Sequence, residues 1–294
     1  MSKFEQREVN GPNNVGLFAL EDIAKDSVIL REIPFYVFSV ENMMQFMASE
    51  NPTGNPSLDG EIRSLQKQIK NANKQYHGQR SSFNEEYPPE VRILLDRMVA
   101  IITEYGFQSE SREVQEKWLS LVDAHQEVRK ESPVGIFGLS SELGKTINGQ
   151  IAYCRGFDKL KKRYIVECTK GSNTNSEKVL LKRENLKTVS GVFRSNSFQE
   201  GLFETRCRIN HACIPNTNSC TIPEYNELHD KRLIPEHPKE CITIAATDIK
   251  AGEELTSSYL FVGAGKGVNV RREELREKYR FECHCKTCLE EDTK

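Results

Sequence analysis

The cysteine-rich segment near the end of the chain constrains the fold more than any other feature. Cys283, Cys285 and Cys288 form a Cys-x-Cys-x-x-Cys pattern. Three thiolates cannot complete a structural zinc site by themselves, because such a site takes four ligands at the corners of a tetrahedron. A distant part of the chain must therefore supply the fourth ligand, and this contact would tie the C-terminal segment to it.

Cys213 is the fourth ligand that we predict, because His211 beside it and a Pro-Asn turn after it hold it in place. Three other side chains remain as alternatives: Cys207, Cys220 and His284. Free buried thiols near a frayed C-terminus are the simpler interpretation. Structural zinc contributes about 10–16 kcal/mol in small peptides, so we expect an ordered tail only with metal.

Length and composition exclude several classes of protein. The chain has 294 residues, enough for one large domain with insertions or for two ordinary domains. It has no run of 18 apolar residues and no apolar segment typical of a signal peptide at its N-terminus. Nine cysteines, with none before Cys154, fit thiols and metal better than a disulfide framework. We expect an intracellular monomer of the nucleus or cytoplasm, with no membrane partner.

One segment of the chain is basic and the rest is acidic. Between Gly144 and Thr188 there are 11 Lys or Arg and 4 Asp or Glu, a net charge of +7. The whole chain carries −2, so the remainder carries −9. Strand-like runs at 151–154, 163–168 and 178–181, with a polar turn at 171–176, predict a small five-stranded barrel for this segment. Three runs resemble SH3-like modules: Gly156–Asp158, Arg163–Val166 and Leu181–Leu186.

The basic barrel has two interpretations. Two groups of cations, Lys159 to Arg163 and Lys182 to Lys187, could hold nucleic acid or an acidic protein tail. A solvated basic face is the simpler alternative, since few aromatic residues lie nearby: Tyr153, Phe157 and Tyr164. Nucleic acid is therefore a candidate partner of residues 144–189, and the predicted function does not depend on it.

The remaining segments alternate between strand and helix patterns. Residues 1–40 indicate strands, notably at 15–19 and 27–30, and we expect a β-rich chain to resume at Phe193, with a strand at 241–246. Apolar spacing predicts three helices in the insertion, and residues 270–279 indicate a charged helix. The insertion has no cysteine, which excludes a cysteine-based zinc finger. Its helices carry Ile62, Leu65, Ile69 and Tyr76, then Val91 to Ile102, then Val114, Trp118, Leu121, Val122 and His125, with loops at 54–60 and 77–84.

Four motifs resemble, in the same order, those of SET-domain protein lysine methyltransferases. They are Val15–Ala19 with Ile33-Pro34, Gly201–Asn216, Gly252–Tyr259 and Tyr279–Cys288. The SET-and-MYND branch is the most similar, because Arg271–Leu275 also has a counterpart there. The sequence carries neither the Cys/His-rich MYND finger of that branch nor, with six residues after Cys288, its C-terminal helical domain.

The resemblance implies methyl transfer from S-adenosylmethionine to a lysine of a histone or another protein, with S-adenosylhomocysteine as the product. Tyr259 would orient the transfer and Tyr279 would line the lysine channel, as the catalytic residues. One structural zinc ion would be bound by Cys213, Cys283, Cys285 and Cys288. The implied cofactor-binding residues are Val15, Gly16, Leu17, Asn196, Asn210, His211 and Phe281.

Two other functions remain open. Asn14 stands where the family usually has glycine, and Val15 replaces a polar or basic residue. An altered turn at 13–15 could weaken cofactor binding, leaving a SET-like scaffold whose basic barrel binds nucleic acid or an acidic partner. The second alternative is methylation of a small molecule or a free amino acid.

The expected architecture is an α+β chain built on a β-rich SET fold of short sheets with a pseudoknot. We expect the N-terminal SET part at 1–40, a helical insertion at 41–143 and the SH3-like basic barrel at 144–189. The C-terminal SET part, with the cofactor and catalytic motifs, would occupy 190–264. A helix and a zinc-bound post-SET tail would complete the chain at 265–294.

Overall fold

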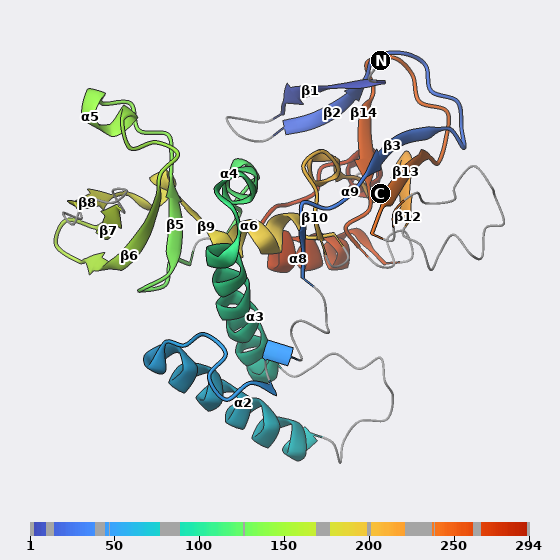
Figure 1. Cartoon of the computed structure of the whole chain (residues 1–294). Helices are drawn as coiled ribbons and strands as arrows, with labels where there is room; N and C mark the ends of the chain where they lie inside the picture. Colours follow the sequence, from blue (N-terminus) through green and yellow to red (C-terminus); the bar gives the residue numbers. More distant parts are fainter. Residues whose placement is uncertain are drawn as a thin grey trace. The chain divides into compact units, whose positions relative to one another are not determined.

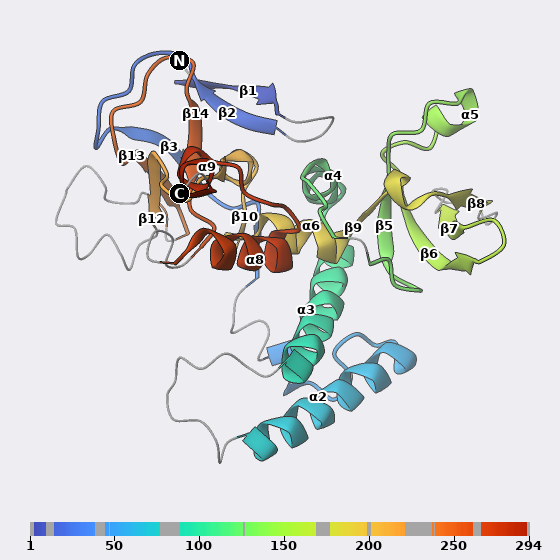
Figure 2. The same cartoon turned by 180° about the vertical axis from the view of Figure 1, so that it is seen from behind.

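Two units make up the computed structural model of the chain (Figures 1 and 2). The first unit contains Met1–Val37, Ser120–Gln126 and Gly191–Lys294, and the second contains Phe38–Leu119 and Glu127–Ser190. None of the helices in the described residues combines the length and apolar character that a membrane span requires. The structure describes residues 3–9, 15–38, 45–46, 48–76, 89–125, 127–168, 177–198, 201–220, 237, 239–260 and 266–292.

The first unit is built on short sheets. One has the strand order β1-β2-β14-β11, where β1 is Phe4–Glu8, β2 is Val15–Ala19, β14 is Glu254–Ser257 and β11 is Asn210–His211. The β11–β14 pair is parallel and places Asn210 opposite Thr256 and His211 opposite Ser257. Two motifs that are far apart in the sequence, at 210–211 and 254–259, are therefore neighbours in one sheet.

Two smaller sheets complete the β-structure of this unit. Strand β13 (Cys241–Ala245) lies between β12 (Thr217–Cys220) and β3 (Val28–Glu32), and β10 (Gly201–Leu202) pairs with β4 (Tyr36–Val37). Burial of apolar side chains from several of these strands stabilises the unit. The main core cluster consists of Leu17, Ala19, Ile23, Ile29, Ile209, Ala245, Ile249 and Leu255.

Helix α8 (Val268–Tyr279) and helix α9 (Lys286–Asp292) form the C-terminal part of the unit. Arg280 ends α8 in the left-handed conformation, with φ of 62°, and its N–H bonds to the carbonyl of Arg276 at 3.2 Å. This is a common way to end a helix. It turns the chain sharply after Tyr279, so the cysteine-rich segment leaves the helix axis at once.

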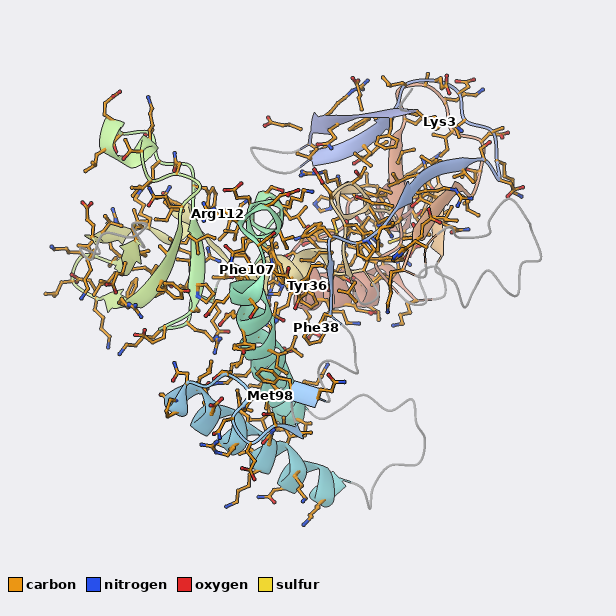
Figure 3. The ribbon with its side chains drawn as sticks, in the orientation of Figure 1. Lys3, Tyr36, Phe38, Met98, Phe107 and Arg112 are labelled. Carbon is orange, nitrogen blue, oxygen red and sulfur yellow. The ribbon has the colours of Figure 1, made fainter. Side chains whose placement is uncertain are left out.

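The helices of the second unit follow the predicted apolar spacing. Helix α2 (Pro56–Tyr76) packs on α3 (Pro89–Ser109) through a cluster that contains Ile62, Met98 and Ile101, and Phe38 packs against it (Figure 3). Farther along α3, Phe107 meets the indole of Trp118 edge to face, with ring centroids 5.4 Å apart. Trp118 belongs to α4 (Arg112–Ser120), and its Nε1 donates to the carbonyl of Val189 at 3.1 Å.

A five-stranded antiparallel sheet forms the rest of the second unit. Its order is β8-β7-β6-β5-β9, and a 3-10 turn at Arg183–Asn185 precedes the last strand. The strand predictions at 151–154, 163–168 and 178–181 are confirmed. One strand lies upstream of residue 144, in the segment expected to be helical. The strands are β5 (Pro133–Ile136), β6 (Ile151–Asp158), β7 (Arg163–Cys168), β8 (Glu177–Leu181) and β9 (Leu186–Thr188), with a short helix α5 (Glu142–Lys145) between β5 and β6.

Three further secondary-structure predictions were wrong. Most of the loop expected at 54–60 is helical, because Asn55 caps α2 by accepting the N–H groups of Ser57 and Leu58 at 3.1 and 3.3 Å. The third helix ends at Ser120, before Leu121, Val122 and His125.

The β-rich segment expected from Phe193 onward begins instead with a helix, α6 (Val189–Asn196). Val189, Val192 and Phe193 recur at helical spacing and are all buried, which explains the helix. The predicted turns at 77–84 and 171–176 lie outside the described residues.

We predict that Ile62→Ala destabilises the α2–α3 pair. Ile62 is 0% exposed, so the substitution leaves a cavity and should cost about 2–5 kcal/mol of unfolding free energy. Ile93→Ala is the matched control, since Ile93 on α3 is 66% exposed and its loss should cost less than about 0.5 kcal/mol. Urea titrations followed by circular dichroism measure both. Equal shifts of the midpoint would contradict the assigned packing.

Candidate functional site

A cavity of about 730 Å³ lies in the first unit, where the predicted motifs meet. Its size is within the range of small-molecule sites. Seven of the nine residues predicted for catalysis or cofactor binding line it. They are Val15, Asn196, Asn210, His211, Tyr259, Tyr279 and Phe281.

The other two predicted residues, Gly16 and Leu17, contribute differently. A Cβ atom on Gly16 would lie 2.4 Å from Oε1 of Glu254 and 3.1 Å from Nδ2 of Asn210. Glycine therefore allows β2 to approach these two side chains closely, and a larger residue would push them aside. The side chain of Leu17 is fully buried in the main core cluster, so its contribution is packing and not a side-chain contact with the cavity.

Asn210 and His211 are held by hydrogen bonds to β14 and to the residues that follow it. Nδ2 of Asn210 donates to Oε1 of Glu254 at 2.8 Å, and Nδ1 of His211 accepts the N–H of Tyr259 at 3.0 Å. The neutral imidazole therefore carries its proton on Nε2. Burial, with a contribution from the positive charge of Arg271, lowers the pKa of His211 to about 4, so the ring is neutral at pH 7.

Three aromatic side chains form one wall of the cavity. The hydroxyl of Tyr259 donates to the carbonyl of Ile209 at 2.8 Å, and burial raises the pKa of Tyr259 above its ordinary value, so it is a neutral phenol. The ring of Tyr279, the last residue of α8, lies 4.9 Å from the ring of Tyr259. Phe281 meets Tyr259 edge to face, with 6.2 Å between centroids. The wall is thus largely aromatic, and the hydroxyl of Tyr259 is held in place by its bond to Ile209.

Asn196 lies at the end of α6 and borders the cavity. Its Nδ2 donates to the carbonyls of Val122 and Val192 at 2.6 and 2.7 Å. These two bonds use both hydrogens of the amide. The oxygen Oδ1 remains as the acceptor that Asn196 can offer to a ligand.

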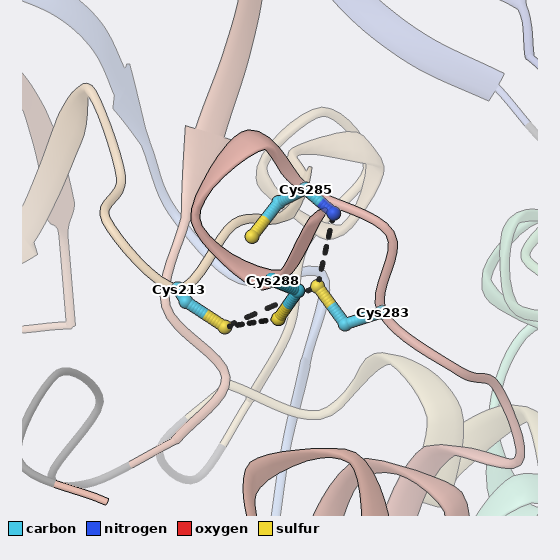
Figure 4. A group of neighbouring side chains, drawn as sticks. All are labelled: Cys213, Cys283, Cys285 and Cys288. Atoms are coloured by element: carbon cyan, nitrogen blue, oxygen red, sulfur yellow. Dashed lines mark hydrogen bonds between the residues drawn. The ribbon is translucent and has the colours of Figure 1, made fainter. Parts of the chain in front are cut away.

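The structure brings Cys213 together with the three cysteines of the tail (Figure 4). All four Sγ atoms lie within 4.8 Å of one another, and Sγ of Cys213 is 3.5 Å from that of Cys288 and 4.0 Å from that of Cys283. Four sulfurs bound tetrahedrally at about 2.3 Å from zinc would be about 3.8 Å apart. The geometry and the all-sulfur donor set therefore fit zinc.

The alternative fourth ligands are not part of this cluster. Cys207 is bonded elsewhere, since its Sγ donates to the carbonyl of Asn196 at 2.9 Å and accepts the N–H of Phe203 at 3.3 Å. His284 borders the cavity but does not belong to the metal-ligating group found among the described residues. The side chain of Cys220 lies outside the described residues.

Arg271 contacts the cysteine cluster and is a residue of the site that the sequence motifs did not predict. Its side chain is 1% exposed, its Nε donates to Sγ of Cys213 at 3.2 Å, and its Nη2 lies 3.6 Å from Sγ of Cys288. The same Nη2 bonds to Glu291 at 2.9 Å. A buried guanidinium in this place offsets the negative charge of ionised thiols. The spacing of the sequence could have indicated this contact. Arg271, Leu275 and Tyr279 recur every four residues on α8, so Arg271 lies on the same face as the predicted site residue Tyr279.

Glu254 is a second residue to which no role was assigned. It lines the cavity and bonds to Asn210. Its neighbour Leu255 is fully buried, and successive residues of a strand point to opposite faces. The alternation of a polar and an apolar residue at Glu254-Leu255 was therefore the feature of the sequence that could have indicated that Glu254 faces away from the core.

Comparisons with known proteins agree with the motifs. The family model described as "SET domain" matches residues 14–260, which is most of the chain. Histone-lysine N-methyltransferase SET5 of Scheffersomyces stipitis is 36% identical over 101 residues, covering 34% of this chain and 18% of that protein. Protein-lysine N-trimethyltransferase SMYD5 of Mus musculus is 34% identical over 110 residues, covering 37% and 23%.

The similarity to a solved structure is weaker in sequence than the similarity to these two relatives. The crystal structure of the SET domain of LSMT bound to lysine and AdoHcy has 16% sequence identity and a TM-score of 0.32, with 96% of this chain and 53% of that chain covered. The matches to the two curated relatives span about a fifth of the length of each relative. The family-model match over residues 14–260 shows that the chain belongs to the SET-domain family.

Proposed function

We propose that the chain is an S-adenosylmethionine-dependent protein-lysine N-methyltransferase. The observation that carries this proposal is the single cavity in which Asn210, His211, Tyr259 and Phe281 meet, in a chain of the SET-domain family. Relatives named as histone-lysine and protein-lysine methyltransferases support a lysine in a protein or peptide as the methyl acceptor. S-adenosylmethionine supplies the reactive methyl carbon and is released as S-adenosylhomocysteine.

The polar groups of the cavity are suited to hold the two ends of such a cofactor. The carboxylate of Glu254 and Oδ1 of Asn196 are acceptors, whereas Nε2–H of His211 lies 3.5 Å from Sγ of Cys213 and bonds to that sulfur. The rings of His211 and Phe281, 6.0 Å apart, offer apolar faces to a flat base. These residues would bind and orient the cofactor.

The aromatic wall would favour the neutral form of the substrate lysine. An ammonium group loses hydration beside Tyr259, Tyr279 and Phe281, and desolvation lowers its pKa, which favours the neutral amine that transfer needs. The bond from Tyr259 to the carbonyl of Ile209 keeps the phenol ring in one orientation. Holding the reacting groups in line can remove up to about 7–11 kcal/mol of the barrier.

We infer one structural zinc ion at Cys213, Cys283, Cys285 and Cys288. Zinc would supply the positive charge that keeps four buried thiols ionised in one place. Phe281 precedes Cys283 by two residues, and His211 precedes Cys213 by two. Fixing the cysteines therefore also fixes the two rings of the cavity.

The predicted domain organisation belongs to the same proposal. The SET parts at 1–40 and 190–264 and the post-SET tail at 265–294 would form the catalytic unit, interrupted by the insertions at 41–143 and 144–189. The strand order β8-β7-β6-β5-β9, with a 3-10 turn before β9, supports the SH3-like interpretation of the sheet. We propose further that the protein is an intracellular monomer of the nucleus or cytoplasm.

Tyr259→Phe should reduce methyl transfer about 100-fold, because the ring loses the hydroxyl that fixes its orientation. Incubation of the zinc-loaded protein with labelled S-adenosylmethionine and a proteome extract measures transfer, and calorimetry measures cofactor affinity, which should stay near that of the wild type. Tyr36→Phe is the control, since Tyr36 packs on Phe193 away from the residues that line the cavity.

Three outcomes would decide against this assignment. Full activity of Tyr259→Phe removes the role of its hydroxyl. Absence of cofactor binding favours the scaffold interpretation. Label that appears only in small molecules favours a free amino acid or another metabolite as the acceptor.

Gly16→Ala should weaken binding of S-adenosylhomocysteine at least about tenfold, equivalent to ~1.4 kcal/mol. The new methyl group meets Glu254 and Asn210 and must displace them from the cavity. Gly60→Ala in α2 is the matched control, since a Cβ atom there meets nothing within 4 Å. Calorimetric titration measures both variants, and unchanged affinity of Gly16→Ala would show that the cofactor binds elsewhere.

Arg271→Met should lower zinc affinity about 10- to 100-fold, because the thiolates lose their hydrogen-bond donor and counter-charge. Arg276→Met is the control, since Arg276 on the same helix is 59% exposed and pairs with Glu282. Competition with a chromophoric chelator measures the affinity. Purified protein without one zinc per chain contradicts the four-thiolate site, whereas equal affinities in both variants contradict only the role of Arg271.

A further inference from the structure

The hairpin that joins β6 to β7 ends in a cluster of cations. Residues 158–163 read Asp-Lys-Leu-Lys-Lys-Arg, and the side chains of the three lysines are exposed. Among the described residues, no carboxylate forms an ion pair with Lys159, Lys161, Lys162 or Arg163. Two other cations of the same sheet are paired: Arg155 with Glu131 and Glu167, and Lys182 with Glu184. The unpaired charge is thus concentrated at one end of the hairpin.

The end of the hairpin has a defined conformation. Oδ1 of Asp158 accepts the N–H groups of Leu160 and Lys161, both at 3.0 Å, and Lys162 is left-handed with φ of 51°. An Asp that bonds to the backbone in this way stabilises a turn. Because the backbone is already ordered, binding a ligand here costs little backbone conformational entropy.

An exposed aromatic ring lies beside these cations. Phe157 stands opposite Tyr164 in the strand register, and their rings are 4.9 Å apart at 60°. Tyr164 packs on the core of the sheet, while Phe157 is 47% exposed. Leu160, within the turn, is 96% exposed. The hairpin therefore combines unpaired positive charge with one accessible aromatic face.

We propose that the β6–β7 hairpin binds single-stranded nucleic acid. Lys159, Lys161, Lys162 and Arg163 contact successive phosphates, and the ring of Phe157 stacks on an unpaired base. An acidic peptide matches the charge but has no flat base for the ring. An anionic bilayer matches the charge but would meet two exposed apolar side chains at the hairpin, Phe157 and Leu160.

The distribution of charge limits the interaction to this part of the chain. Residues 144–188 carry +7 and the remainder carries −9, so a polyanion is attracted to the basic segment and repelled elsewhere. This proposal is independent of methyl transfer, since no residue of the hairpin lines the cavity.

The test uses the full chain and a fluorescent single-stranded DNA of about 20 nucleotides, longer than the sites of most single-strand binders. Fluorescence anisotropy between about 50 and 200 mM KCl gives the affinity and its salt dependence. Four phosphate contacts predict a slope of log K against log salt near −3, at ~0.7 per contact. The triple variant Lys159→Gln, Lys161→Gln, Lys162→Gln should bring the slope to about −1 and lower the affinity at least about tenfold.

A matched variant controls for net charge. Lys67→Gln, Lys70→Gln and Lys74→Gln remove three exposed lysines from α2 and should leave both affinity and slope unchanged. Phe157→Leu separates stacking from charge: affinity should fall at least about fivefold with the slope retained. Thermal unfolding checks that each variant folds, and within the described part of the chain the three lysines of the turn have no ion pair whose loss would weaken the sheet.

Several results would overturn the proposal. If the hairpin triple variant and the α2 triple variant bind the DNA with equal affinity, the nucleic acid binds elsewhere on the chain. Unchanged affinity of Phe157→Leu, or equal affinity for single-stranded and duplex DNA of the same length, would exclude base stacking. Tighter binding to vesicles containing phosphatidylserine, or to a polyglutamate peptide, would assign the surface to a membrane or to an acidic protein.

Discussion

The meeting of Cys213 with the cysteines of the tail is the interaction on which the candidate site depends. Cys213 is separated along the chain from Cys283 by 70 residues and from Cys288 by 75 residues. His211 and Phe281 lie two residues before Cys213 and Cys283, so the same contact brings their rings to 6.0 Å. Tyr279, Arg280 and Phe281 line the cavity immediately before the first tail cysteine. Without this contact the cavity would lose one of its walls.

Burial explains how the proposed zinc ion would stabilise this cluster. Desolvation, together with the neighbouring Cys288 thiol, raises the pKa of Cys213 to about 12, while the hydrogen bond from Arg271 opposes the rise. The hydrogen bond from Arg271 offsets part of this rise and does not cancel it. Arg271 reaches two of the four sulfurs from α8, the helix that ends in Tyr279. The metal-binding group and the aromatic wall are therefore parts of one packed region.

Sequence patterns predicted much of the local structure. Strands at 151–154 and 163–168 and the helices around Ile62 and Met98 were identified because period-two and helical spacing report directly on which side chains are buried. The helix α6 was missed because it is short and follows a strand, so two apolar patterns run into each other. Strand β5 was missed for a similar reason, since Pro133–Ile136 is only four residues long and buried throughout.

For the site, the sequence by itself determined the chemical groups: an Asn-His pair, two tyrosines, a phenylalanine and four cysteines in motifs typical of one family. Motif spacing carries that information because each short run adopts one local geometry. Only the tertiary structure decided that Cys213 rather than Cys207 joins the tail, that Leu17 packs in the core, and that Arg271 and Glu254 contact the site. These outcomes depend on which strands pair and which helix faces are buried, and contacts between residues 40 to 70 positions apart leave little trace in the local sequence.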